Sequence, residues 1–345
     1  MPYGFLFHPE DKMEITIHTK TKDYPVIQER GILKRAAEVI GRQGHVFLVS
    51  DSGVPEQWRN ILQEQYPDAH MHVFACGEQS KNFDTLRALL EDMLEHHVSR
   101  ADTVIALGGG VVGDLAGFAA ASYMRGIAYV NIPTTTLSQI DSSIGGKTAI
   151  DLNGHKNCVG AFWQPDMVLV DTDVLSTLSP RHYSNGLAEA IKEGLVFDEE
   201  LFSVFEKDDY LEHIDEIIHR CLEIKKNVVE HDEREAGERK LLNFGHTIGH
   251  AYESSHGLNE YLHGECVGMG MLAIMENEEL KERLRAVLKR LHLPLACGSD
   301  PQEVYRMLLN DKKADHDTIT IVQVDEIGKG YLQKTDIESL WRKLI

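Results

Sequence analysis

The segment Leu241–Glu265 holds four histidines, and two of them, His246 and His250, are four residues apart. On a helix this spacing puts both imidazoles on one face, where they could bind one metal ion. Residues 246–250 read HTIGH, so they have the histidine spacing of the HExxH zinc-protease motif without its glutamate. The pattern indicates a metal or proton-transfer site. Spacing alone does not decide which of the four histidines, including His256 and His263, would bind the metal.

A polar stripe runs through the same segment. Arg239, Asn243, His246 and His250 follow one another at intervals of four, three and four residues, which places them on one side of a helix. Their neighbours are largely apolar, and buried polar groups are unfavourable unless something binds them. The sequence therefore predicts one helix through residues 239–251 whose polar stripe faces a ligand.

A carboxylate that could complete a metal site lies in GLAEAIKEG. Glu189 and Lys192 are three residues apart there, on a predicted helix that is otherwise made of Leu, Ala and Ile. One acid and two histidines are typical of a catalytic zinc site that leaves a coordination position open for substrate.

A second kind of site is indicated by DTVIALGGGVVGDLAG, in which Gly108, Gly110 and Gly113 have GxGxxG spacing between a predicted strand and a predicted helix. Such a turn lets the backbone and the helix N-terminus approach a dinucleotide pyrophosphate. The turn follows about the fourth strand rather than the first, so the acid for the ribose would come from upstream. Asp51, at the end of HVFLVSD, is the candidate; a plain turn aspartate is the alternative. Other polar residues at strand ends are expected at the same edge, namely Glu78, Lys81, Thr134 and Thr135.

Cationic side chains are concentrated in and around the glycine-rich stretch DSSIGGKTAIDLNGHKNCVGAF. Its lysines and amide suit a phosphorylated ligand. The combination, rather than any one residue, predicts a site for a dianion, built from Asp141, Lys147, Lys156, Asn157, Arg125, Arg239, Lys225 and Lys312.

The composition narrows the function classes. The 345 residues carry 35 Lys and Arg against 55 Asp and Glu, a formal net charge of −20, which argues against nucleic-acid and anionic-membrane binding. No window of 18 consecutive apolar residues occurs, and the N-terminal residues do not resemble a secretory signal. Five scattered cysteines with no CxxC predict thiols in a reducing cytoplasm.

These groups must be positioned by two kinds of element. Up to about residue 178, short Val- and Ile-rich strands alternate with helical patterns such as FDTLRALLEDMLEHH, which predicts βαβ units and a mostly parallel sheet. Later segments read as amphipathic helices, with a short strand pair in TITIVQVDEIGKGYLQ. We expect an α/β, Rossmann-like domain over 1–178, a mainly helical domain over 179–345, and the site in a cleft between them.

Several long blocks, taken together and in order, resemble the 3-dehydroquinate synthase family of sugar phosphate cyclases. They are GGGVVGDLAGFAAASYMRGI, IPTTTLSQIDSSIGGKTAID, GHKNCVGAFWQP, GLAEAIKEG, DEREAGERKLLNFGHTIGHAYE and HGECVGMGM. The resemblance implies a cytoplasmic homodimer that uses NAD⁺ and zinc or cobalt. It also implies conversion of 3-deoxy-D-arabino-heptulosonate 7-phosphate (DAHP) to 3-dehydroquinate and phosphate in the shikimate pathway. The implied order is oxidation, β-elimination of phosphate, reduction, ring opening and aldol closure.

The resemblance also divides the residues by role. It implies metal ligands Glu189, His246 and His263, and it leaves His250 as an acid/base group. The implied substrate and proton-transfer set is His250, Lys147, Asn157, Arg125 (from the other subunit), Asn243, Arg239, Lys225, Lys192, Asp141 and Lys312, with Lys313 as an alternative to Lys312. The implied NAD set is Asp51, Glu78, Lys81, Gly109, Gly110, Val111, Val112, Gly113, Asp114, Thr134, Thr135, Lys147, Lys156 and Thr177. One departure is Cys158, where a larger aliphatic residue is expected.

Three alternatives stay open on the sequence. Other sugar phosphate cyclases share the fold, NAD and metal, but the DSSIGGKTAID and GHKN segments favour a 3-dehydroquinate synthase. A polyol dehydrogenase of the glycerol dehydrogenase type would need no cation cluster. A catalytically idle NAD sensor or scaffold would need neither the metal residues nor the cations.

Overall fold

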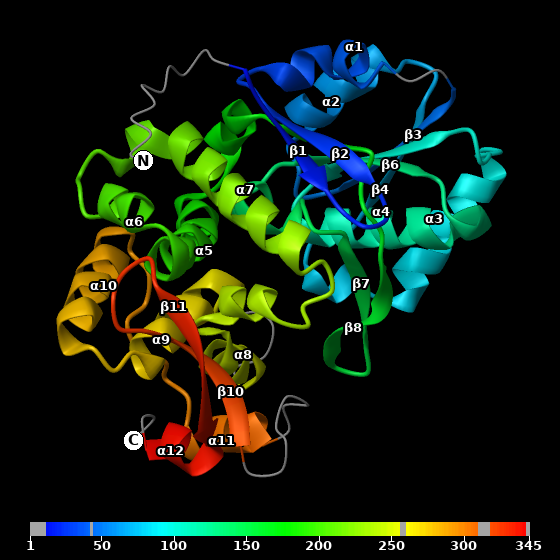
Figure 1. Ribbon diagram of the computed structural model, residues 1–345. Coiled ribbons are helices and arrows are strands. Elements are labelled where there is room, and N and C mark those ends of the chain that lie inside the picture. The colour runs from blue at the N-terminus through cyan, green and yellow to red at the C-terminus, as the bar shows by residue number, and fades with distance from the viewer. Residues whose placement is uncertain (1–11, 42–43, 256–259, 310–317, 343–345) are drawn as a thin grey trace. The chain divides into compact units, whose positions relative to one another are not determined.

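The computed structural model of the chain describes residues 12–41, 44–255, 260–309 and 318–342 (Figure 1). The chain forms two compact units, one of residues 1–178 with 225–230 and the other of residues 179–224 with 231–345. The first break falls where Leu178 is followed by Ser179, whose side chain accepts a hydrogen bond from the backbone N–H of His182 and caps helix α5 (Pro180–Phe197). Helix α7 (Ile214–His231) contributes residues to both units.

The first unit is built on a seven-stranded sheet in the order β1-β2-β9-β6-β5-β3-β4. Neighbouring strands are parallel except β1, which pairs antiparallel with β2 at the edge. The strands are β1 (Met13–His18), β2 (Asp23–Gln28), β3 (Val46–Asp51), β4 (His70–Phe74), β5 (Thr103–Gly108), β6 (Ala128–Pro133) and β9 (Met167–Val170). The mostly parallel sheet expected from the sequence is confirmed, and β2 is an addition that the sequence analysis missed.

Helices cover both faces of this sheet, because alternate residues of its buried strands pack in opposite directions. On β5, Val104 and Ala106 belong to the core under α3 (Phe83–Glu95) and α4 (Gly110–Ser122). Ile105 and Leu107 belong to the core under α1 (Ala36–Ile40) and α2 (Glu56–Gln65). Figure 1 shows these two helix pairs on opposite sides of the sheet.

The strand order creates a switch point between β3 and β5. From β3 the chain moves outward to β4 and then returns to form β5 on the other side of β3. Asp51 ends β3 and Gly108 ends β5, so the two predicted NAD segments follow neighbouring strands at this point. In open α/β sheets the carboxyl ends of strands at a switch point are where ligands bind. The glycine turn therefore need not follow the first strand.

The glycine-rich cationic stretch forms a hairpin that the sequence analysis did not predict. Strands β7 (Lys147–Leu152) and β8 (His155–Phe162) pair antiparallel, with an irregularity between Ile150 and Leu152. Just before the hairpin, Ser138–Ser142 forms a π-helical turn, η4, that contains Asp141.

The second unit is mainly helical, as expected. It contains α5, α6 (Glu199–Phe205), most of α7, α8 (His246–Ser255), α9 (His263–Ile274), α10 (Glu278–Arg290), α11 (Pro301–Leu309) and α12 (Ile337–Arg342). The predicted strand pair is confirmed as β10 (Thr318–Val324) and β11 (Gly330–Asp336).

The predicted single helix through residues 239–251 is wrong. A 3-10 helix, η7 (Glu238–Asn243), ends before α8 begins at His246, and Gly245 between them has a φ of 77°. A β-carbon on Gly245 would lie 2.5 Å from Met271 Cγ, and one on Gly249 would lie 2.9 Å from the Cys266 carbonyl oxygen. Glycine therefore allows both the left-handed turn and the close packing of α8 on α9. The polar stripe consequently continues only from His246 to His250.

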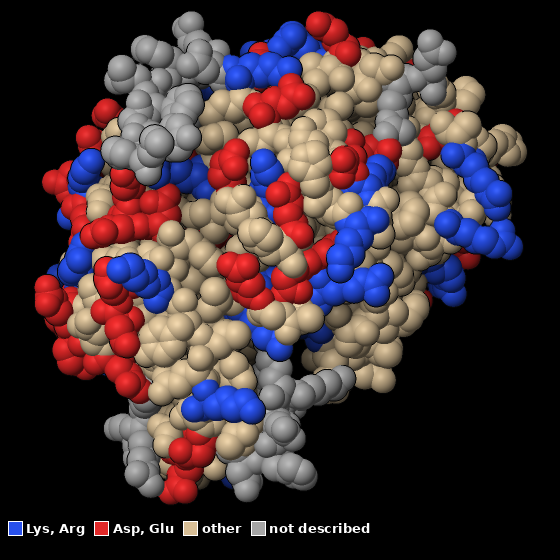
Figure 2. All heavy atoms as spheres, in the orientation of Figure 1, with Lys and Arg blue, Asp and Glu red and all other residues tan. Residues whose placement is uncertain are grey.

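The surface of the second unit carries much of the negative charge. Figure 2 shows acidic side chains gathered over α6 and α10, with basic ones between them. Among the described residues, no helix is both long and apolar enough to cross a lipid bilayer. All five cysteines are thiols, and Cys221 and Cys266 are buried.

Candidate functional site

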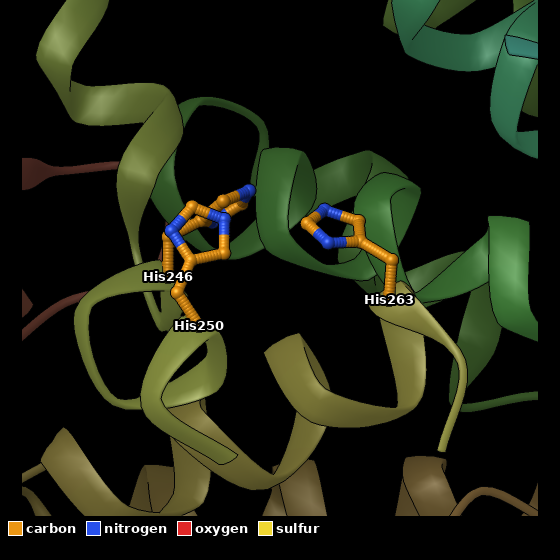
Figure 3. A group of neighbouring side chains, drawn as sticks. All are labelled: His246, His250 and His263. Atoms are coloured by element: carbon orange, nitrogen blue, oxygen red, sulfur yellow. The ribbon is translucent and has the colours of Figure 1, made fainter. Parts of the chain in front are cut away.

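Three helices of the second unit bring together one carboxylate and three imidazoles. Glu189 lies on α5, His246 and His250 lie on α8, and His263 begins α9. The ring centroids are 5.3 Å apart for His246 and His250, 5.3 Å for His246 and His263, and 5.7 Å for His250 and His263. One nitrogen of each ring lies within 4.8 Å of the others. Figure 3 shows His263 facing the two rings of α8.

Glu189 is the buried carboxylate of this cluster, with 1% of its side chain exposed. Its Oε2 accepts a hydrogen bond from Lys192, whereas its Oε1 has no hydrogen-bond partner. That Oε1 lies 3.7 Å from His246 Nε2 and 3.5 Å from His263 Nε2. Burial alone would raise the pKa of Glu189, but Lys192 and the two imidazoles hold it well below its usual value. A buried anionic oxygen between two nitrogens is a position that a cation would satisfy.

The two imidazoles that face Glu189 are oriented through their other nitrogens. His246 Nδ1 donates to the Phe244 carbonyl oxygen at 3.1 Å, and His263 Nδ1 lies 3.5 Å from Glu253 Oε2. Each ring thereby turns Nε2 toward Glu189. Histidines that bind metals are held in this way, with the second nitrogen on a carbonyl or carboxylate. The residues therefore fit a divalent metal ion.

Glu253 was missed by the sequence analysis. It lies three residues after His250 on α8, so its helical spacing was visible, but its partner His263 comes from α9. Burial lowers the pKa of His263, yet the neighbouring carboxylates of Glu189 and Glu253 raise it to about 10. Burial holds the pKa of His246 well below its usual value despite the attraction of Glu189. The cluster thus stabilises positive charge between Glu189 and Glu253.

The other predicted residues of this unit lie on α5 and η7. Lys192 is buried beside Glu189. Arg239 is also buried and donates to the Glu233 carbonyl oxygen at 2.6 Å, and Asn243 donates to Glu235 Oε1 at 2.7 Å. Lys312, its alternative Lys313 and His256 lie outside the described residues.

In the first unit, the predicted phosphate turn lies at the N-terminus of α4, with Gly109 as the N-cap. A β-carbon on Gly109 would lie 3.1 Å from Thr135 Cγ2, and one on Gly110 would lie 3.3 Å from Ser142 Oγ. The Thr134 N–H donates to the Gly108 carbonyl oxygen at 2.9 Å. Small residues are thus needed for packing here, and the helix N-terminus also favours an anion. Of the remaining residues of the turn, Val112 is buried in the core, while Val111 and Gly113 are half-buried.

Two residues predicted to bind the nucleotide have partners within the first unit. Asp51 Oδ1 accepts from the N–H groups of Gly53 at 2.8 Å and Val54 at 3.2 Å, the contacts of a turn aspartate. Burial raises the pKa of Asp51 despite these hydrogen bonds. Thr177 Oγ1 accepts from Trp58 Nε1 at 2.8 Å.

A buried lysine gathers most of the other predicted residues of this unit. Lys81 Nζ lies 2.7 Å from Asp114 Oδ2 and 3.5 Å from Glu78 Oε1, and it donates to the Asn157 side-chain oxygen. Lys156 Nζ lies 3.9 Å from the same Glu78 oxygen. Burial raises the pKa of Asp114 to about 6, although Lys81 lowers it. The structure thereby joins predicted cofactor residues to Asn157, which was predicted to bind substrate.

The remaining cations of the first unit are arranged differently. Lys225 is buried, and its Nζ donates to the carbonyl oxygen of Asp141 at 2.5 Å and to its carboxylate. Lys147 is exposed at the start of β7, and Arg125 is exposed in the turn η3 (Tyr123–Arg125) with a φ of 69°.

Two sequence families match consecutive stretches of the chain, which together span residues 71–314. The 3-dehydroquinate synthase N-terminal family matches residues 71–185, and the 3-dehydroquinate synthase C-terminal family matches residues 186–314. A 3-dehydroquinate synthase of Clostridium beijerinckii is 37% identical over 345 aligned residues, covering 94% of this chain and 99% of that protein. The one of Clostridium acetobutylicum is 40% identical, covering 93% and 96%.

Solved structures give the same picture of the fold. A 2-deoxy-scyllo-inosose synthase complexed with carbaglucose-6-phosphate, NAD⁺ and Co²⁺ superposes with a TM-score of 0.85 at 25% identity, covering 96% of this chain and 99% of the other. A 2-epi-5-epi-valiolone synthase from Streptomyces hygroscopicus, with NAD⁺ and Zn²⁺ bound, gives 0.84 at 27% identity, covering 95% and 98%. A glycerol dehydrogenase from Schizosaccharomyces pombe gives 0.65 at 16% identity, covering 97% and 90%, and shares the fold alone.

The α/β unit, the helical unit and the glutamate–histidine centre define a protein of the sugar phosphate cyclase class. Within that class the chain belongs to the 3-dehydroquinate synthase family, which confirms the family and the fold class expected from its sequence motifs.

Proposed function

We propose that the chain converts DAHP into 3-dehydroquinate and phosphate, using NAD⁺ and a divalent metal ion. The family match covers the functional blocks of both units, and curated relatives at 37–42% identity are 3-dehydroquinate synthases. The observation that carries the proposal is the Glu189 oxygen without a hydrogen-bond partner, which two oriented imidazole nitrogens face.

Glu189, His246 and His263 would hold the metal ion, zinc or cobalt. The separations of 3.5 and 3.7 Å from Glu189 Oε1 to the two Nε2 atoms are close to the spacing of about 3–3.6 Å between ligands with metal bonds of about 2.0–2.2 Å. When bound, such an ion lowers the pKa of a coordinated substrate hydroxyl. Lys192 keeps Glu189 ionised and so keeps the ligand in its binding form.

His250 lies beside this centre and would move protons rather than bind the metal. Its ring is 5.3 Å from that of His246, so it adjoins the centre, and the family resemblance assigns it to proton transfer. An imidazole next to a bound substrate can accept or donate a proton near neutral pH.

The dinucleotide would bind at the switch point of the sheet, where NAD⁺ supplies a hydride acceptor for the first step. The N-terminus of α4, with Gly109, Gly110, Val111, Val112 and Gly113, would receive the pyrophosphate. Other groups would line the same site: Asp51, Glu78, Lys81, Asp114, Thr134, Thr135, Lys147, Lys156 and Thr177. Because Asp51 already accepts two backbone hydrogen bonds through Oδ1, Oδ2 is the oxygen we assign to the ribose.

Cations and amides would bind the phosphate and carboxylate of DAHP. We assign this to Lys147, Asn157, Arg125, Asn243, Arg239, Lys225 and Lys312, with Asp141 and Lys192 orienting hydroxyl groups. Buried Arg239 and Lys225 are held by a carbonyl oxygen and by Asp141, so their positions are fixed before substrate arrives. Holding the substrate in one reactive conformer contributes much of the rate in such a reaction. The entropy of ordering the substrate is then lost on binding and no longer adds to the activation barrier.

One assay tests the proposed function. The full chain is supplied with DAHP, Zn²⁺ and NAD⁺ in amounts well below the substrate, and released phosphate and NADH absorbance are followed together. Phosphate release without net NADH supports the proposal, because the hydride is returned. Steady NADH production with a simple polyol would indicate a dehydrogenase, and no phosphate from DAHP would reject the proposal.

A second sugar phosphate cyclase activity is the nearest alternative, since two such enzymes share the fold at 25–27% identity. Glucose 6-phosphate, whose carba analogue is bound in the 2-deoxy-scyllo-inosose synthase structure, tests for that activity when it is offered in place of DAHP. We expect no phosphate release from glucose 6-phosphate, because the family match is to 3-dehydroquinate synthases.

The enzyme is also proposed to be a cytoplasmic homodimer. The family resemblance supports this, as do the exposed Arg125, assigned to the partner's site, and the buried thiols Cys221 and Cys266. Light scattering at micromolar concentration tests the dimer, and an Arg125→Ala variant that keeps its mass but loses turnover tests the shared site.

A further inference from the structure

A second group of histidines lies on the first unit, on elements that the proposed reaction does not use. His70 and His72 alternate along the edge strand β4, so their side chains leave the same face of the sheet. Asp92 lies in the last turns of α3, and His96 is the C-cap of that helix. Strand β4 and helix α3 thus contribute side chains to one cluster.

The three imidazoles converge on the carboxylate of Asp92. His70 Nε2 lies 2.9 Å and His72 Nδ1 lies 2.6 Å from Asp92 Oδ2. His96 Nδ1 lies 3.0 Å from Oδ1 and also 3.0 Å from the Asp92 carbonyl oxygen. The rings of His70 and His96 are stacked, with centroids 3.6 Å apart and planes inclined by 17°.

Two nitrogens and one carboxylate of this group have the composition of a transition-metal site. One ligand atom each from His70, Asp92 and His96 lies within 4.8 Å of the others. The separations of 2.9 Å (His70 Nε2 to Asp92 Oδ2) and 3.0 Å (His96 Nδ1 to Asp92 Oδ1) are hydrogen-bond lengths. An ion with bonds of about 2.0–2.2 Å places its ligands roughly 3–3.6 Å apart, so it would replace these hydrogen bonds after small side-chain shifts. The His96 side chain is 41% exposed, and a rotation of its ring out of the stack would bring this second imidazole to the ion.

The fourth residue supplies the support that metal ligands need. His72, only 15% exposed, donates to Asp92 Oδ2 and fixes the carboxylate from behind. Ligating carboxylates are typically hydrogen-bonded in this manner, and the open coordination positions of a two-histidine, one-carboxylate site are filled by water.

We propose that His70, Asp92 and His96 form a second site for a divalent transition-metal ion such as Zn²⁺, separate from the glutamate–histidine centre of the second unit. All three residues belong to the first unit, and none is assigned to substrate or NAD. A bound ion would cross-link the C-terminal end of α3 to the edge strand β4. Its role would be to stabilise the first unit rather than to take part in the reaction.

The test compares zinc bound by full-length wild type and by His96→Gln after equilibrium dialysis against buffered Zn²⁺. We expect the variant to bind one ion fewer per chain. The test uses the difference in zinc bound per chain between wild type and His96→Gln. Zinc bound at the glutamate–histidine centre is the same in both proteins and does not affect this difference. His155→Gln, which removes an exposed histidine on β8, is the matched control and should bind as much zinc as wild type.

Two further measurements keep the test decisive. His72→Gln should retain the site with an affinity lower by about 10- to 100-fold, because it removes only the support of the carboxylate. Cu²⁺ bound to wild type should show imidazole nitrogen couplings in electron paramagnetic resonance that are reduced in both His70→Gln and His96→Gln. Equal zinc content in wild type and both variants would overturn the proposal and leave a hydrogen-bonded cluster only.

Discussion

Among the described residues, two histidine clusters differ in how the oxygens of their carboxylates are hydrogen-bonded. In the second unit, Glu189 Oε1 is buried, anionic and without a hydrogen-bond partner, and two imidazole nitrogens stop 3.5 and 3.7 Å away. In the first unit, the oxygens of Asp92 are within 3.0 Å of three imidazole nitrogens and are partly exposed to water.

This difference separates a centre that needs an ion from a cluster that can accept one. Lys192 pairs with Glu189 Oε2, but Oε1 is a buried oxygen without a hydrogen-bond partner, which is unfavourable and which a bound cation would relieve. The Asp92 cluster is satisfied by hydrogen bonds alone, and water screens what remains. Removing a residue should therefore have large consequences in the first case and small ones in the second.

The largest effect is expected for Glu189→Gln. The substitution keeps the shape but removes the anionic ligand, so metal binding at this centre should be lost. A metal ion contributes several kcal/mol to such reactions, so turnover should fall about a thousand-fold or more. Phosphate release from DAHP and zinc content measure the two effects together. Glu279→Gln on the exposed side of α10 is the control, and a Glu189→Gln protein with wild-type zinc and turnover would contradict the assignment.

The next effect separates the two histidines of α8. His250→Ala should keep the metal and lower turnover by about a hundredfold or more, as for loss of an acid/base group. His246→Ala should lose the metal, because Nε2 of that residue faces Glu189. Zinc content by mass spectrometry decides between them. Equal zinc loss in the two variants would show that His250 is a ligand.

A smaller effect is expected for Glu253→Gln. Glu253 Oε2 lies 3.5 Å from Nδ1 of His263 and so would position a proposed metal ligand through its second nitrogen. The change should weaken metal binding by about 10- to 100-fold, measured by competition with a chelator of known affinity. Glu253→Asp, which retains the charge, should recover part of it. If Gln binds metal as tightly as wild type, Glu253 has only a packing role.

The smallest effect is expected for His72→Gln in metal-free protein. Because the Asp92 cluster is partly exposed, losing one of its hydrogen bonds should change the free energy of unfolding by about 1 kcal/mol or less. Urea unfolding followed by circular dichroism measures it. A loss several times larger would mean that this cluster, too, is a buried structural centre, and the contrast with Glu189 would fail.

Much of the sheet was predictable because buried parallel strands are continuous Val- and Ile-rich runs. Strand β5, TVIALG, is buried at every position. Strand β2 was missed because DYPVIQ contains Pro25, which is tolerated at the turn side of an antiparallel edge pair. The β7–β8 hairpin was missed because β8 is mostly exposed and the surrounding glycines made the stretch resemble a loop.

The candidate site was only partly predictable for a similar reason. Helical spacing found Glu189 with Lys192 and His246 with His250, since those pairs lie within one element. It could not find the contact of Glu253 with His263, which joins α8 to α9. It also extended the polar stripe through Gly245, because periodicity does not register a single left-handed residue. The sequence left two roles open for Asp51, as a ribose ligand or as a turn residue. Its hydrogen bonds with the backbone N–H groups of Gly53 and Val54 show that it stabilises a turn.

The close packing of α8 on α9 fixes the distance between His246 and His263. A β-carbon on Gly249 would lie 2.9 Å from the Cys266 carbonyl oxygen, so an alanine there must push the two helices apart by several tenths of an ångström. Those helices carry His246 and His263, and metal–ligand bonds tolerate deviations of only about 0.2 Å. One added methyl group is too small to block the substrate, but the helix displacement that it causes would exceed this tolerance. Glycine at this position therefore keeps the two proposed ligands, His246 and His263, at a fixed distance from each other.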